Sequence, residues 1–209
     1  MSRLRGAVFL VAAAMAAAAL LAWMDAITSD RIANNELELR LAALRSVLPA
    51  DAYDNEPHLD AIFVTDEALL GDAKPLPVYR ARLGAEPTAV VLTAVAPNGY
   101  TGDIRLMIGI HVDGHVLAAS VVEHRETPGV GDAIETEKSD WILGFSGLQS
   151  ENPLAPEWVL DKDGGDFDGI TGATVTSHAV VSAVRNAVVY FNANRELLLS
   201  AAPTTASSD

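Results

Sequence analysis

The sequence predicts an α+β domain tethered by one N-terminal transmembrane helix. Residues 6–24 carry no charged side chain, and at ~1.5 Å per residue they span roughly 28 Å, close to a bilayer core of about 30 Å. Several β-rich runs separated by turn residues follow, and a long apolar-periodic segment closes the chain. Strands followed by a helix are typical of an antiparallel sheet with flanking helices.

The charges around the apolar run predict its orientation. Arg3 and Arg5 precede it and Asp25 follows it, so the positive-inside rule places residues 1–5 in the cytoplasm and the rest of the chain outside. A cleaved signal peptide is the alternative, since Ala17-Ala18-Ala19 supplies small residues. Apolar residues continue to Met24, which favours an uncleaved anchor over the shorter core of a signal peptide.

Residues 25–55 are expected to form a stalk helix and a turn. Ser29 and Asp30 are candidate helix caps, apolar residues recur at helical spacing up to Leu48, and Pro49 ends the pattern. The folded domain is then expected over residues 56–199. The small polar residues 200–209 are expected to be a disordered tail.

Five extended segments are predicted within the domain, and they should pair as an antiparallel meander. Asp113-Gly114 is a strong hairpin signal between the last two. A short capped helix is expected over residues 139–145 and the final helix over residues 177–199, with Val180, Val181, Val184, Val188 and Phe191 facing inward. The extended segments are residues 61–64, 75–80, 88–96, 104–112 and 116–122.

Composition excludes several functions. The 209 residues include no cysteine, so disulfides, thiolate metal sites, cysteine-ligated iron–sulfur clusters and c-type haem attachment are excluded. Removing Arg3 and Arg5 from the 14 Lys and Arg leaves 12 against 28 Asp and Glu, a net charge of −16. So acidic a surface repels nucleic acid.

The most informative segment is residues 168–177, which read Asp-Gly-Ile-Thr-Gly-Ala-Thr-Val-Thr-Ser and run into the final helix. Backbone N–H groups and the helix dipole at such a start favour an anion such as phosphate. The competing interpretation is ordinary helix capping by Thr174, Thr176 or Ser177.

The pattern Asp-x-x-Thr-Gly-Ala-Thr-x-Thr resembles the flavinylation motif of the FMN-binding domain family. In that family a separate flavin transferase esterifies the last threonine to the phosphate of FMN. The resemblance implies covalent FMN on Thr176, with the rest of the motif around the phosphate. Those other motif residues are Asp168, Thr171, Gly172, Ala173 and Thr174.

A second segment, Glu126-Thr127-Pro128-Gly129-x-Gly131, is similar to a loop in the G-subunit branch of Rnf ion-translocating electron transport complexes. The turn that contains Tyr100 also matches this branch. The resemblance implies that Glu126, Thr127, Pro128 and Gly129 border the flavin ring; a rigid corner without ligand contact is the alternative. A dinucleotide loop is excluded, because Ile134 stands where its third glycine belongs.

The resemblance implies an electron-relay subunit in the bacterial inner membrane, with its FMN domain in the periplasm. The complex would couple electron transfer between ferredoxin and NAD to ion translocation, and the partners would be its other membrane and iron–sulfur subunits. Two alternatives stay open: a flavoprotein like the C subunit of the sodium-translocating NADH:quinone reductase, and a non-redox anchored interaction domain.

The remaining polar residues predict no metal site and no catalytic triad. His111 and His115 flank the hairpin turn and are expected to face each other as solvated side chains. Glu135 and Glu137 have no recognisable partner in the sequence. Lys138 is a candidate cation near the N1/C2 edge of the flavin, although a solvated lysine is the simpler interpretation.

Overall fold

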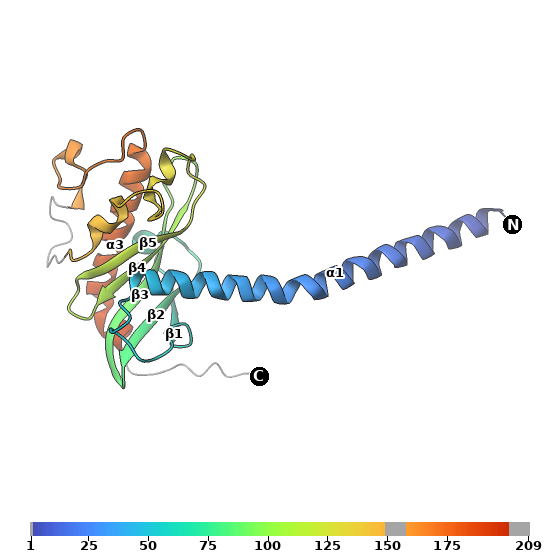
Figure 1. Ribbon diagram of the computed structural model, residues 1–209, viewed down its shortest axis with the longest axis horizontal. Coiled ribbons are helices and arrows are strands. Elements are labelled where there is room, and N and C mark those ends of the chain that lie inside the picture. The colour runs from blue at the N-terminus through green and yellow to red at the C-terminus, as the bar shows by residue number, and fades with distance from the viewer. Residues whose placement is uncertain (1, 149–157, 201–209) are drawn as a thin grey trace. The chain divides into compact units, whose positions relative to one another are not determined.

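The computed structural model describes residues 2–148 and 158–200. It contains two units, Met1–Ala42 and Ala43–Asp209. The first unit is most of helix α1 (Ser2–Val47), and the second begins with the last turn of that helix and holds the sheet and the remaining helices (Figure 1). The predicted tail beyond residue 200 lies outside the described residues.

Helix α1 is continuous, so Ser29 and Asp30 lie within it and do not cap the start of the predicted stalk helix. The chain from Asp25 to Arg45 has neither glycine nor proline, so nothing in it forces a break and the helix propagates through polar residues. It ends at Val47, two residues before Pro49, as predicted. Within it, Arg5–Met24 is long and apolar enough to cross a membrane, and every side chain there is exposed.

The second unit is built on a five-stranded antiparallel sheet in the order β1-β2-β3-β4-β5, which confirms the predicted meander. Each strand pairs with the next in the chain, and the β4–β5 hairpin turns at Asp113 and Gly114. The strands are β1 (Ala61–Val64), β2 (Leu76–Leu83), β3 (Glu86–Ala96), β4 (Ile104–His111) and β5 (Val116–Glu123).

The two faces of the sheet have separate cores. Helix α3 (Thr174–Leu199) packs on one face, and all five of its predicted inward residues are buried. On the other face, Leu44, Val47 and Leu48 pack against side chains such as Val91 and Met107. Alternation along the strands supplies both cores, since successive side chains point to opposite faces.

Short helices connect these elements. Helix α2 (Glu67–Leu70) was missed by sequence reasoning because it is a single turn, although Asp66 caps it and Gly71 closes it in the left-handed region. The predicted helix over residues 139–145 is the 3-10 helix η2 (Trp141–Phe145). Two more 3-10 helices, η1 (Gly131–Ile134) and η4 (Asp161–Asp163), lie before and after it in the chain.

A buried ion cluster fixes the end of α3 to the sheet edge. Asp60 pairs with Arg80 and with Arg82, whose Nε lies 2.7 Å from the carboxylate. Both guanidinium groups also donate at 3.1 Å to the carbonyl of Ser200. The first residue of the predicted tail therefore takes part in a defined hydrogen-bond network.

Candidate functional site

The first turn of α3 lacks a side-chain cap. The helix begins at Thr174, three residues earlier than predicted, and its N-cap is Ala173, which has no side-chain oxygen. The capping interpretation of Thr174, Thr176 and Ser177 was therefore wrong. The early N–H groups of a helix have no intrahelical partner, and here no side chain from the cap position satisfies them.

The turn before α3 is held by a residue that the sequence analysis treated as a cap. Ser177 is fully buried; its hydroxyl accepts a hydrogen bond from Ile170 N–H at 3.0 Å and donates to the carbonyl of Ala173 at 3.0 Å. Gly172 has a φ of +83°, in the left-handed region that favours glycine. Trp141 Nε1 donates to the carbonyl of Asp168 at 2.6 Å, which ties the turn to η2.

Thr176 and Glu126 bring the two sequence motifs together. Thr176 lies in the first turn of α3 with 1% of its surface exposed, and its hydroxyl donates a hydrogen bond to Glu126 Oε2. Glu126 lies in the loop between β5 and η1 with 3% exposed. This pairing joins residues 50 positions apart, so no local pattern predicts it.

Glu126 is surrounded by donors and by glycines. Its carboxylate accepts hydrogen bonds from Thr101 N–H at 3.0 Å and Tyr100 N–H at 3.3 Å. The Thr101 hydroxyl is shared between this carboxylate, at 3.1 Å, and the carbonyl of Arg125, at 2.5 Å. A Cβ on Gly99 would lie 2.9 Å from Oε1, and one on Gly131 would lie 2.9 Å from Glu126 Cβ. The two glycines therefore leave the space that the carboxylate occupies.

The ionisation of Glu126 follows from this environment. Burial raises the pKa of the carboxyl, but the hydrogen bonds from Thr101, Thr176 and Tyr100 stabilise the charged form and together hold the pKa below its ordinary value of 4.5. At neutral pH the group beside the Thr176 hydroxyl is a carboxylate.

A cleft of about 400 Å³ opens beside this pair. Six of the ten sequence-predicted site residues line it: Glu126, Thr127, Gly172, Ala173, Thr174 and Thr176. Asp168, Thr171, Pro128 and Gly129 do not line it. Four residues that sequence reasoning did not assign to the site also line it: Tyr100, Val130, Gly131 and Val175.

Three of these additional lining residues, Tyr100, Val130 and Val175, form an exposed apolar rim of the cleft. Tyr100 is 70% exposed, Val175 49% and Val130 39%, although each is a large side chain. Tyr100 lies in a turn that the resemblance had singled out, which was the available signal. Val130 and Val175 lie inside the two motifs at positions where the motif accepts any residue, so the pattern carried no signal for them.

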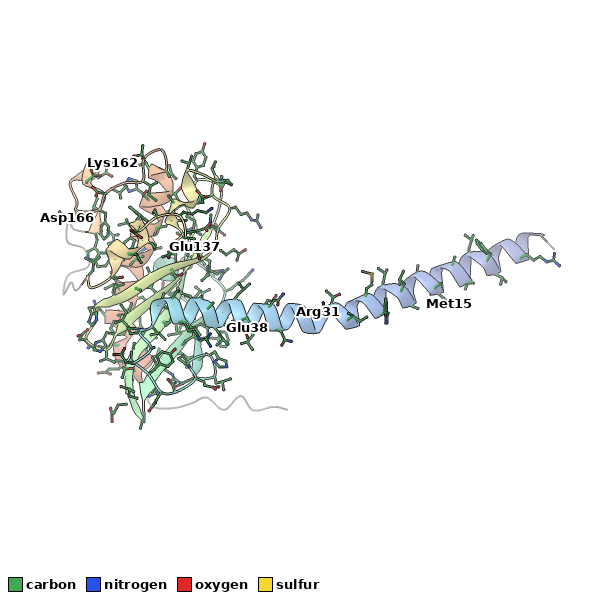
Figure 2. The ribbon with its side chains drawn as sticks, in the orientation of Figure 1. Met15, Arg31, Glu38, Glu137, Lys162 and Asp166 are labelled. Carbon is green, nitrogen blue, oxygen red and sulfur yellow. The ribbon has the colours of Figure 1, made fainter. Side chains whose placement is uncertain are left out.

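Two further polar contacts, His124 with Glu135 and Lys138 with Asp132, lie close to Glu126 in the chain. His124 Nε2 lies 2.6 Å from Glu135 Oε1, a partner for Glu135 that the sequence did not reveal. Lys138 Nζ lies 3.8 Å from Asp132 Oδ2, and Asp132 also accepts from Gly129 N–H at 2.7 Å. The side chains of Glu137, Lys162 and Asp166 are exposed; all three are labelled in Figure 2. A role for Lys138 toward a flavin stays a prediction.

The hairpin histidines face each other, as predicted. Their rings stack with centroids 4.7 Å apart, and His111 Nδ1 and His115 Nδ1 lie 3.0 and 2.6 Å from Asp113 Oδ1. Burial raises the pKa of Asp113, but hydrogen bonds from His115 and His111 outweigh it and lower the pKa to about 2. The three groups could hold a metal ion, but the hydrogen bonds to Asp113 already account for their arrangement.

Comparison with known proteins identifies the family. The profile of the FMN-binding domain matches residues 99–189, a range that contains both motifs and the cleft. The chain is 45% identical over 199 residues to the G subunit of the ion-translocating oxidoreductase complex from Pseudomonas aeruginosa (strain UCBPP-PA14), which covers 95% of this chain and 93% of that protein.

Other relatives carry the same description. The G subunit from Pseudoalteromonas atlantica is 44% identical over 174 residues, covering 83% of this chain and 81% of that protein. The one from Vibrio cholerae is 41% identical over 179 residues, covering 86% and 85%. With this identity over most of both chains, and an FMN-binding domain around the cleft, the chain belongs to the family of ion-translocating oxidoreductase complex G subunits.

Proposed function

We propose that the protein is the FMN-carrying electron-relay subunit of an ion-translocating oxidoreductase complex, with its flavin held through a phosphoester on Thr176. The observation that carries the proposal is the position of the Thr176 hydroxyl, which borders the cleft and is hydrogen-bonded to a carboxylate. The family membership supplies the flavin, and the geometry supports the attachment point.

The residues present fit an FMN group. The uncapped N–H groups of the first turn of α3 and the Thr174 hydroxyl suit a phosphate. The rim formed by Tyr100, Val130 and Val175 offers apolar surface for a planar ring. The cleft, at about 400 Å³, is within the range of cofactor sites.

Covalent attachment has a physical rationale in this location. The cleft is open, and its large rim side chains are exposed, so a non-covalent cofactor would be lost by dilution outside the cytoplasm. A phosphoester removes that equilibrium and leaves the ring unmodified. When bound, the flavin supplies a group that accepts and passes electrons, and nearby charges and hydrogen bonds set its potential.

The N-terminal helix supports a membrane location. Arg3 and Arg5 precede the span and Asp25 follows it. By the positive-inside rule, the N-terminus lies on the cytoplasmic side of the bacterial inner membrane and the FMN domain lies in the periplasm. The helix then continues unbroken to Val47, which suits an uncleaved anchor. Maturation requires a flavin transferase, and the other membrane and iron–sulfur subunits exchange electrons with the flavin.

Complementation tests this function. A strain that lacks the chain receives either the wild-type gene or a Thr176→Ala variant, and membranes are assayed for electron transfer from reduced ferredoxin to NAD. Wild-type chain should restore the activity, and the variant should join the complex without restoring it. Activity restored equally by Thr176→Ala would contradict the relay role, and activity with quinone alone would favour the quinone-reductase type.

A further inference from the structure

The buried Glu126 carboxylate holds the Thr176 hydroxyl by a hydrogen bond. Its position also suits it to take part in the reaction that forms the phosphoester. We propose that Glu126 is the general base of flavin attachment, taking the proton of Thr176 as its oxygen attacks phosphorus. The inference rests on the proposed phosphoester at Thr176 and adds a catalytic residue contributed by the acceptor protein.

The Glu126 carboxylate is hydrogen-bonded to the hydroxyl oxygen that would react, Oγ1 of Thr176. The Thr176 hydroxyl points its hydrogen at Glu126 Oε2, which leaves its lone pairs for a bond to phosphorus. A threonine hydroxyl is a weak nucleophile at neutral pH and needs a neighbouring base. Both side chains border the cleft that the incoming flavin phosphate would enter.

The atom balance of phosphoester formation at Thr176 identifies the chemical class of the flavin donor. An alcohol does not condense with a phosphate monoester in water, so the donor must be an activated flavin nucleotide, a phosphoric anhydride brought by the transferase. The Thr176 Oγ1–phosphorus bond forms, the anhydride P–O bond breaks, and the leaving phosphate departs with the bonding electron pair. The hydroxyl proton moves to Glu126, and no atom is oxidised or reduced.

The surroundings keep Glu126 charged and in place. Three of its hydrogen-bond contacts come from the turn that holds Tyr100 and Thr101. Of the neighbouring charged groups, Arg125 is exposed and His124 pairs with Glu135.

Asp132, in η1, lies 3.8 Å from the ammonium of Lys138. The factors that lower the pKa of Glu126 are therefore hydrogen bonds rather than these charges.

The test measures mass gain by the purified, unmodified full-length chain in detergent, with an excess of active transferase and flavin adenine dinucleotide as donor. Glu126→Gln should be modified roughly 10²-fold or more slowly than wild type at neutral pH, and its rate should rise with pH as hydroxide replaces the missing base. Glu123→Gln, which changes an exposed carboxylate nearby, should match wild type. A Glu126→Gln rate equal to wild type would overturn the inference.

A second variant keeps the test decisive if Glu126→Gln does not fold. Thr101→Val removes the hydroxyl that the carboxylate shares with the carbonyl of Arg125, so the acid limb of the modification rate should move to higher pH relative to wild type. An unmoved limb would count against Glu126 as the base. The proposed function fails separately: a wild-type chain that gains no mass with an active transferase contradicts the phosphoester, whatever the variants do.

Discussion

The Thr176 hydroxyl donates to the Glu126 carboxylate across a gap of 50 positions in the chain. This contact joins the first turn of α3 to the loop after β5, and it is buried although it borders an open cleft. The threonine-rich segment that leads into α3 and the loop after β5 therefore meet at one cleft, where the Glu126 carboxylate accepts hydrogen bonds.

The Glu126 carboxylate should make the stability of the unmodified domain pH-dependent. Because its pKa is lowered in the folded state, its contribution is present above the ordinary value of 4.5 and is lost as the pH falls through the folded value. The free energy of unfolding should thus decrease on acidification. Glu126→Gln should flatten that decrease and Glu123→Gln should not, as measured by urea unfolding at several pH values.

Ser177→Ala should loosen the turn before α3. The substitution removes a fully buried hydroxyl and leaves the half-buried N–H of Ile170 without its partner, which costs about 1–3 kcal/mol of unfolding free energy. Ser46→Ala is the matched control, because the Ser46 hydroxyl also donates to a carbonyl but is exposed. Denaturant unfolding measures both, and equal values for the two variants would contradict the role assigned to Ser177.

Gly109→Ala should disturb the packing of α1 on the sheet. A Cβ at Gly109 would lie 2.3 Å from the carbonyl oxygen of Val47, so the helix end must shift, at a typical cost of about 1–3 kcal/mol. At Gly144 a Cβ would meet nothing within 4 Å, so Gly144→Ala should change the melting temperature little. Thermal unfolding of the two variants makes the comparison. An unchanged melting temperature for Gly109→Ala would contradict the close approach of Gly109 to the Val47 carbonyl.

Asp60→Asn should destabilise the domain more than any change at an exposed ion pair. It removes the charge that faces two buried guanidinium groups, and breaking a buried pair costs about 3–5 kcal/mol. Glu123→Gln breaks an exposed pair with Arg105 at 3.6 Å and should cost about 1 kcal/mol or less. Chemical unfolding measures the loss in free energy of unfolding for both variants. Similar losses would show that burial does not make the Asp60 ion pairs more important for stability than an exposed pair.

The strands could be predicted because their signals are local. Runs of β-branched residues end at turn residues such as Asp113 and Gly114, and the observed strands follow these limits within a few residues. The start of α3 was misplaced because hydroxyl residues resemble caps, whereas the structure puts Ala173 at the cap and uses the Ser177 hydroxyl to hold the preceding turn.

The long-range contacts could not be predicted. The sequence contains Asp60, Arg80 and Arg82 as isolated charges, and only the pairing of β1 with β2 brings them together. In the same way, the two motifs that include Glu126 and Thr176 were recognised separately, and the fold determines that these side chains meet. Side chains at motif positions that accept any residue, such as Val130 and Val175, carried no signal for the cleft that they line.

The most direct test of the central claim is the intact mass of the chain after expression with an active flavin transferase, compared with Thr176→Ala and Thr174→Ala. Once the reaction has gone to completion, wild type and Thr174→Ala should both have gained the mass of FMN minus one water, since Thr174 is assigned to the phosphate but does not carry the ester, and Thr176→Ala should gain nothing. A wild-type chain without that gain, or a Thr176→Ala chain that retains it, would contradict covalent FMN at Thr176.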